Sequence, residues 1–233
     1  MVRDWPHAIA LAERLQRDLG ENRARDIAHF RCELAAHALA GDALSRFEVA
    51  RHELEQAVRA DPAHPRPQLL LGEVAAAEGD HAAAIEAWRR VERESPAWLA
   101  LVTPGWLAAF AALGRRDEGI DALEAVHREH PSIDAFSALA AARAERDGGP
   151  AAVAWAEQAL QAAPSLLGLE KLLAMKVELR RGDDQAEVEL AQRLIQAQAR
   201  RLSRYVCGHC GFKARQFYWQ CPGCNRWDTY APK

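Results

Sequence analysis

A recurring spacing of three residues constrains the fold of this chain more than any other feature. In each copy a small residue is followed four positions later by a second apolar residue, and eight positions after that by a proline. The four clearest copies are Ala50, Leu54 and Pro62; Ala84, Trp88 and Pro96; Gly119, Leu123 and Pro131; and Ala152, Ala156 and Pro164. The prolines are 34, 35 and 33 residues apart. A period of this length indicates helical pairs that bury their apolar faces by stacking on one another.

One repeat shows how the pair is built. The stretch "PQLLLGEVAAAEGDHAAAIEAWRRVERESP" predicts a helix over 66–78, a turn at Gly79, and a second helix over 81–94. Glycine after a helix favours a left-handed cap, and a proline cannot continue the helix that precedes it. We expect Gly72 and Ala84 to let the paired helices approach closely, and Trp88 to fill the gap to the neighbouring pair.

This pattern resembles the tetratricopeptide repeat. It departs from that repeat at Gln68 and Ala75, where aromatic residues are preferred, and in the extra residues of "AGDALSRFEVA". The fold class that follows is an all-α superhelix of helix pairs, over 1–202, with about five pairs and one leading unpaired helix. Weaker copies of the spacing begin at Ala8 and Ala186. Such a stack has a groove that can hold a peptide or a helix, or only the protein's own segments.

The first helix has no partner before it in the sequence, and an unpaired apolar face at the end of such a stack is unfavourable. We therefore expect the chain to be the C-terminal part of a longer protein.

The last residues, 203–233, carry a different motif. Four of the five cysteines form Cys-x2-Cys-x10-Cys-x2-Cys at Cys207, Cys210, Cys221 and Cys224. Two such pairs can bring four thiolates to one centre, which is the ligand set of a closed tetrahedral site for Zn²⁺ or a single iron. We predict that these four residues bind one metal ion and that the segment forms a small ribbon with short strands.

We expect the metal to be structural rather than catalytic. Four protein ligands leave no position for water or substrate. A segment this short cannot build an adequate core, so metal binding would supply most of its folding free energy, on the order of 10 kcal/mol. A thioredoxin-like redox pair would need a βαβ context, which the flanking sequence lacks.

The ribbon segment also contains aromatic and basic residues. From residue 200 onward there are seven basic residues and one acidic residue, whereas the rest of the chain has 23 basic and 32 acidic residues. A basic tail on an acidic body can bind nucleic acid or anionic lipid, and it can equally dock onto its own body. Aromatic side chains can stack on bases, with Lys213 and Arg215 on the phosphates, but they more often form the ribbon's own core. We regard nucleic-acid binding as the weaker interpretation.

No other motif indicates chemistry. The pair His127 and His130 lacks the His-Glu-x-x-His spacing of zinc-binding helices, and His209 is expected to tune or screen the cysteine site rather than bind the metal. Cys32 is expected to be a small buried residue. The sequence contains no phosphate-binding loop, nucleophile elbow or paired carboxylates, so we predict that the chain is not an enzyme. It also lacks an apolar run long enough to span a bilayer.

The segment "HFRCELAAHAL" (29–39), the repeats, and "YVCGHCGFKARQFYWQCPGCNRWDTY" together resemble the family of lipopolysaccharide assembly protein B, also called LapB or YciM. The likeness runs over essentially the whole chain and is most specific in the ribbon, which that family's members share as a rubredoxin-like domain. Asn225 stands where rubredoxins usually have a second glycine, and the two cysteine pairs are closer together than in rubredoxins. Both departures weaken an inference of electron transfer.

The resemblance implies an adaptor that restrains lipopolysaccharide synthesis. Members of that family promote degradation of the deacetylase LpxC by the membrane protease FtsH, and the regulator YejM (PbgA) opposes this. They carry an N-terminal membrane helix that holds the repeats on the cytoplasmic face of the inner membrane. Two alternatives stay open from the residues alone: a nucleic-acid-binding ribbon carried by a repeat domain, and a scaffold that senses metal or redox state.

Overall fold

The computed structural model describes residues 3–42, 44–179, 185–200 and 202–230. It divides the chain into two compact units, Met1–Gly114 and Arg115–Lys233. Each unit has apolar clusters of its own. Helices dominate both units, and the short strands lie only near the C-terminus of the described residues. The predicted fold class, an all-α helical repeat with a small four-cysteine ribbon, is therefore confirmed.

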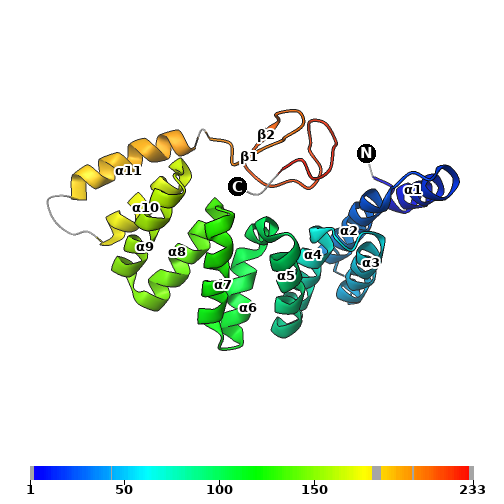
Figure 1. Ribbon diagram of the computed structural model, residues 1–233, viewed down its shortest axis with the longest axis horizontal. Helices are drawn as coiled ribbons and strands as arrows, with labels where there is room; N and C mark the ends of the chain where they lie inside the picture. Colours follow the sequence, from blue (N-terminus) through cyan, green and yellow to red (C-terminus); the bar gives the residue numbers. More distant parts are fainter. Residues whose placement is uncertain (1–2, 43, 180–184, 201, 231–233) are drawn as a thin grey trace. The chain divides into compact units, whose positions relative to one another are not determined.

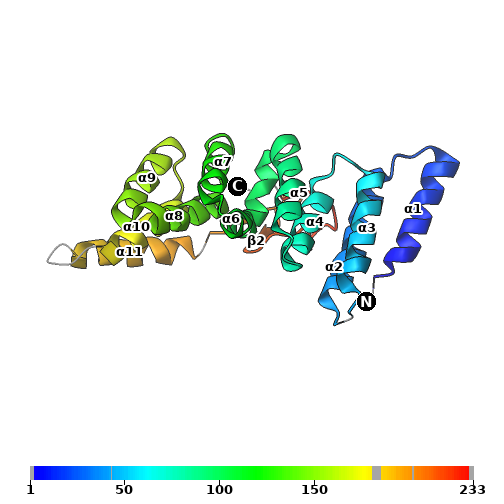
Figure 2. The same cartoon turned by 90° about the horizontal axis from the view of Figure 1, so that it is seen from below.

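The first unit is a row of antiparallel helices, of which neighbours along the chain pack together (Figure 2). Its elements are α1 (Trp5–Leu19), α2 (Ala24–Ala40), α3 (Arg46–Ala60), α4 (Pro65–Ala77), α5 (His81–Glu94), the 3₁₀ helix η1 (Pro96–Val102) and α6 (Thr103–Ala112). The predicted helices 66–78 and 81–94 thus match α4 and α5 within one residue. Gly79 has a φ of +83°, as expected for a left-handed cap, and the Asp80 side chain accepts a hydrogen bond from the Ala83 amide at the start of α5.

Trp88 of α5 explains two of the glycines in this unit. Its indole is 1% exposed, and its Nε1 donates to the Leu69 carbonyl at 3.1 Å. A Cβ on Gly72 of α4 would overlap the indole, and one on Gly105 of α6 would lie 3.0 Å from its Cη2 atom. The tryptophan therefore fills the space between its own pair and the next helix, which confirms the role expected from the repeat.

The second unit contains α7 (Arg116–Glu129), α8 (Ile133–Asp147), α9 (Gly149–Ala162), α10 (Leu166–Leu179) and α11 (Gln185–Ala199), followed by β1 (Tyr205–Val206) and β2 (Lys213–Ala214). In Figure 1, α8, α9 and α10 lie side by side, with α11 against α10. Phe136 of α8, Ala156 of α9 and Leu172 of α10 form one buried cluster.

The small and apolar positions of the four clear repeats are all buried. Ala50, Leu54, Ala84, Trp88, Leu123, Ala152 and Ala156 are at most 1% exposed, and Gly119 is buried as well. The weaker copy near the end of the chain behaves differently, because Ala186 is exposed and Leu190 of α11 is 51% exposed. The spacing therefore marks buried positions in the clear repeats but not in α11.

The start of the third clear repeat, the one that contains Gly119 and Leu123, was not anticipated from the sequence. Residues Pro96–Val102 form a 3₁₀ helix before α6 begins, and Leu99 within it is completely buried.

Among the helices of the described residues, none is both long and apolar enough to cross a bilayer. The predicted domain boundary between 202 and 203 stays a prediction.

Candidate metal centre

The ribbon begins with a short hairpin that positions the first cysteine pair. β1 and β2 are antiparallel, with Tyr205 opposite Ala214 and Val206 opposite Lys213. Cys207 follows β1 directly, and its amide donates to the Phe212 carbonyl at 2.9 Å. This bond closes the loop that contains both cysteines of the first pair. The hairpin thus holds Cys207 and Cys210 on one tight turn.

The two cysteine loops repeat the same backbone pattern. In the first, the Gly211 amide donates to the Cys207 carbonyl at 3.0 Å; in the second, the Asn225 amide donates to the Cys221 carbonyl at 2.8 Å. Gly211 and Asn225 both have positive φ, at 74° and 57°. Asparagine tolerates this left-handed conformation better than most residues with a Cβ. Asn225 therefore takes the backbone conformation of the glycine it replaces.

A second glycine in the ribbon is required by packing. A Cβ on Gly223 would lie 3.0 Å from Cδ2 and 3.2 Å from Cβ of Phe212. The second loop can therefore approach the first only because position 223 lacks a side chain. This contact brings the two cysteine pairs together.

All four predicted ligand sulfurs lie within 4.8 Å of one another. Two of the separations are 3.8 Å, between Cys207 and Cys224, and 3.6 Å, between Cys210 and Cys221. A tetrahedral zinc site with Zn–S bonds of about 2.3 Å places its sulfurs about 3.8 Å apart. The cluster therefore fits a tetrahedral metal ion. Among the described residues, no histidine or carboxylate joins this cluster. Metal binding by the four cysteines stays a prediction.

The electrostatics of the cluster favour a bound cation. Burial raises the pKa of the Cys207 thiol, but hydrogen bonds to its sulfur, including one from the Cys210 amide at 3.4 Å, outweigh this and lower the pKa to about 5. The neighbouring thiols oppose further ionisation, because like charges this close cannot all be uncompensated. A divalent cation would remove that opposition and hold all four sulfurs as thiolates.

The ribbon's aromatic residues pack mostly on one another. Tyr230 is completely buried and Tyr205 is 6% exposed. The ring of Phe217 lies edge-on to Tyr205 and to Trp219, with centroids 5.7 Å and 5.0 Å apart. These contacts fit the expectation that the aromatics form the ribbon's core. They leave these rings poorly placed for stacking on bases.

Asp134 of α8 connects the ribbon to the helical repeats of its own unit. It forms an ion pair with Arg204 and accepts a hydrogen bond from the Tyr205 hydroxyl at 3.1 Å. Burial, together with the charge of Asp134, raises the pKa of Tyr205 to about 12, so the phenol stays a donor near neutral pH. One acidic residue of the body therefore holds the start of the basic tail. No pattern in the sequence singles out Asp134.

The histidines singled out from the sequence and the fifth cysteine supply no ligand atom to the sulfur cluster, although His209 lies in the loop between Cys207 and Cys210. His130 and His209 are exposed, whereas Cys32 is completely buried in α2, as expected. His127 is buried, which lowers its pKa, and its Nδ1 accepts from the Ser132 amide at 3.4 Å.

In the first unit, His29 and His64 form a buried pair with their Nε2 atoms 3.0 Å apart. Sequence reasoning missed this pair, since the two residues are 35 positions apart.

Comparison with known proteins agrees with this description. Residues 205–232 match the family described as "Rubredoxin metal binding domain", the ribbon of LapB. The chain is 32% identical over 231 residues to lipopolysaccharide assembly protein B of Escherichia coli (strain K12), and 23% identical over 236 residues to the protein of that name from Haemophilus influenzae. These alignments cover 98% and 99% of the chain but only 58% of each relative.

Among solved structures, MamA 41-end from Desulfovibrio magneticus RS-1 aligns with a TM-score of 0.46 at 18% identity, over 76% of this chain and 97% of that chain. A thermophilic TPR protein of Thermus thermophilus aligns with a TM-score of 0.44 at 18% identity, over 75% of this chain and 100% of its own. The resemblance inferred from the sequence is confirmed by the curated relatives and by the match of the ribbon. The chain is similar to lipopolysaccharide assembly protein B over 98% of its own length and spans 58% of that protein.

Proposed function

We propose that this chain is a non-enzymatic adaptor that regulates lipopolysaccharide biosynthesis. Its clients would be LpxC and FtsH, and the adaptor would promote proteolysis of LpxC by FtsH, with YejM (PbgA) opposing it. The observation that carries the proposal is the alignment with lipopolysaccharide assembly protein B over 98% of the chain, ribbon included. Stacked helical pairs support it, since such surfaces bind peptides and helices.

The metal ion would act as a structural staple. Cys207, Cys210, Cys221 and Cys224 would hold Zn²⁺ or iron, and a closed four-thiolate site supplies folding free energy rather than a reactive position. The sulfur spacing supports this role, as does the loop pairing around Cys207 and Cys221. We place the boundary of this ribbon domain at residue 203, directly before Arg204 and Tyr205.

The ribbon's contribution to client binding would be indirect. Arg204 and Tyr205 bind Asp134 at the start of α8, so a folded ribbon holds its first residues against the repeats. Loss of the metal would unfold the ribbon and release this contact. In the full-length protein we expect the repeats to lie on the cytoplasmic face of the inner membrane, as the resemblance implies.

Capture of purified LpxC by the full-length product of this gene tests the proposal. We expect the wild type to bind LpxC and to recover FtsH from detergent-solubilised membranes. The double variant Cys207→Ser/Cys210→Ser should lose this binding while circular dichroism still reports helical repeats. The variant Lys213→Ala, which changes an exposed ribbon residue outside the cluster, serves as the control and should bind normally. Failure of the wild type to bind LpxC would contradict the client assignment, and full binding by the double variant would contradict the role of the ribbon.

A further inference from the structure

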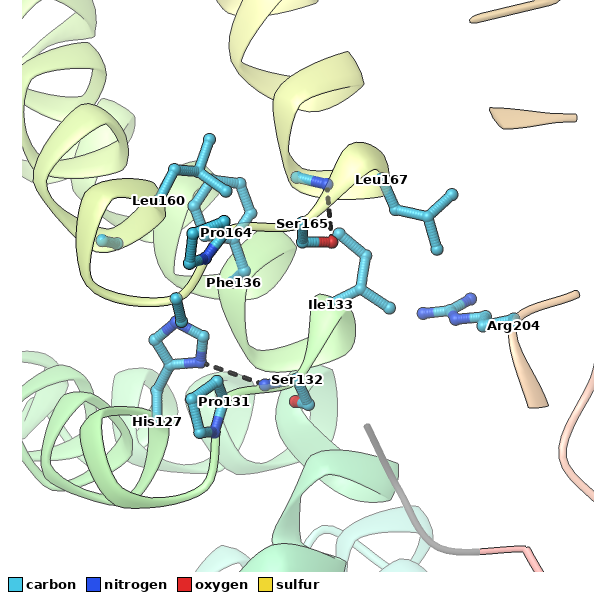
Figure 3. A pocket seen from close by; sticks show the side chains of 13 residues that line it. His127, Pro131, Ser132, Ile133, Phe136, Leu160, Pro164, Ser165, Leu167 and Arg204 are labelled. Atoms are coloured by element: carbon cyan, nitrogen blue, oxygen red, sulfur yellow. Dashed lines mark hydrogen bonds between the residues drawn. The ribbon is translucent and has the colours of Figure 1, made fainter. Parts of the chain in front are cut away.

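A pocket of about 330 Å³ lies beside the contact between the ribbon and the repeats. It is formed by the end of α7, the start of α8, the end of α9 and the start of α10, and Arg204 lies at its rim (Figure 3). Its apolar walls are made by Pro131, Ile133, Phe136, Leu160, Pro164 and Leu167. This volume is at the low end for ligand pockets and suits one or two large side chains.

The pocket's polar groups are few and mostly satisfied. His127 has its pKa lowered by burial and is therefore neutral at pH 7, with Nδ1 accepting from the Ser132 amide. The Ser165 hydroxyl accepts from the Gly168 amide at 3.3 Å. Figure 3 shows both bonds, and it shows the side chains of Ile133 and Leu167 extending toward the Arg204 guanidinium. The interior is thus apolar, with a cation at one edge.

Two further hollows continue the pocket on either side. One of about 590 Å³ shares Ile133, Leu167 and Arg204 with it, and another of about 680 Å³ shares Leu160, Pro164 and Ser165. The pocket and these two hollows therefore form one longer groove that follows the start of α10. Such a groove suits an extended chain better than an isolated small molecule.

The groove is basic where it passes the ribbon. Four basic residues and one acidic residue line the 590 Å³ hollow; they are Lys171, Arg200, Arg204, Arg215 and Glu170. Lys171, Arg200 and Arg215 are exposed, and none of them forms an ion pair with another residue of the described ranges. The nearby Asp134 is already engaged by Arg204 and Tyr205. The surplus positive charge of this hollow favours binding of an anionic partner.

We propose that this groove is a docking site for an acidic peptide segment, which inserts one large apolar side chain into the 330 Å³ pocket. Carboxylates next to that side chain pair with Lys171, Arg200 and Arg215. The apolar pocket directly beside the basic hollow is what points to this chemistry. The proposal rests on the proposed adaptor function, because it assigns the kind of client segment that the repeats hold.

Binding of three labelled peptides to the purified chain, followed by fluorescence anisotropy, tests the site. The probe is a nine-residue peptide with a central phenylalanine flanked by glutamates. One comparison peptide has alanine in place of the phenylalanine, and the other has lysines in place of the glutamates. We expect the probe to bind at least about tenfold more tightly than either comparison peptide, with an affinity that falls as salt is raised.

Charge reversal on the protein locates the binding. The double variant Lys171→Glu/Arg215→Glu changes two exposed residues and should weaken the probe by about tenfold, the effect of reversing two partly exposed attractions. Arg93→Glu is the matched control, because Arg93 is exposed on α5 and lines neither the pocket nor the two hollows that continue it. It should change the affinity by less than about twofold.

The proposed docking site would be contradicted if all three peptides bound with equal affinity, or if the double variant bound the probe as tightly as the wild type does. The proposal would also be contradicted if the chain bound vesicles of anionic phospholipid instead of the probe peptide and the double variant lost this vesicle binding. The groove would then face a membrane rather than a peptide. These outcomes leave the adaptor proposal standing if LpxC is still captured through another surface. Conversely, if the probe peptide binds specifically but LpxC is not captured, the assignment of LpxC as the client is contradicted and the peptide site still stands.

Discussion

Asp134 should couple the ribbon energetically to α8. Its carboxylate binds both Arg204 and the Tyr205 hydroxyl, the latter at 3.1 Å. Hydrogen bonds to charged groups contribute about 1.5–3 kcal/mol, and the lower end applies because the Asp134 side chain is 26% exposed. We expect Asp134→Asn to lower the free energy of unfolding by about 2 kcal/mol, and Tyr205→Phe by about 1.5 kcal/mol.

A double-mutant cycle isolates the contact between these two residues. The doubly substituted chain should be about 1 kcal/mol more stable than the sum of the single effects predicts, because each substitution alone already removes the charge-assisted hydrogen bond between the phenol and the carboxylate, which can be lost only once. Urea unfolding followed by circular dichroism measures this coupling. Transfer of metal from the ribbon to a coloured chelator gives a second readout, and it should be up to about thirtyfold faster in Asp134→Asn, the factor that corresponds to about 2 kcal/mol.

A second tyrosine provides the control cycle. The Tyr218 hydroxyl accepts a hydrogen bond from Gln216 at 2.5 Å within the ribbon itself. Tyr218→Phe combined with Asp134→Asn should therefore be additive within about 0.3 kcal/mol. If the Tyr205 cycle is equally additive, the ribbon is not held by Asp134 and the reasoning fails.

Burial and geometry lead to three further predictions. Gly72→Ala should destabilise the first unit by about 2 kcal/mol, measured by urea unfolding, because overpacking against Trp88 outweighs the gain in helix propensity; unchanged stability would contradict the packing. A chelator that removes the metal, or Cys221→Ser, should abolish the dispersed ribbon signals in an NMR spectrum, and spectra that persist without metal would argue against a staple. Burial lowers the pKa of His127 from its ordinary value of 6.5, so the contribution of His127 to stability is fully present above pH 6.5 and falls as the pH drops below 6.5. His127→Gln should reduce this loss of stability in acid, measured by urea unfolding at several pH values. An equal loss in the variant would exclude His127 as its cause.

The repeat could be predicted from the sequence because it depends on local spacing. A small residue and a second apolar residue four positions apart lie on one helical face, and their burial in four copies follows from that geometry. The same spacing failed at Leu190, because α11 presents that residue to solvent. Spacing reports the face on which a residue lies but not whether a neighbour covers the face.

The proximity of the four cysteines was predictable for a similar reason, whereas the attachment of the ribbon to α8 was not. Two Cys-x-x-Cys loops carry the geometry of their sulfurs within a few residues, and Asn225 could be recognised as a departure. The contact of Asp134 with Tyr205 joins residues 71 positions apart, and the pair of His29 and His64 joins residues 35 apart. Such contacts depend on how helices and ribbon pack, which no local pattern in one sequence encodes.

The half-life of LpxC in growing cells tests the central claim most directly. It should be measured after protein synthesis is stopped, in a strain whose only copy of this gene encodes either the wild type or Cys207→Ser/Cys210→Ser. The account predicts rapid, FtsH-dependent loss of LpxC with the wild type, and a several-fold longer half-life with the variant. An LpxC half-life that is the same with the wild type, with the variant and without the gene would contradict it.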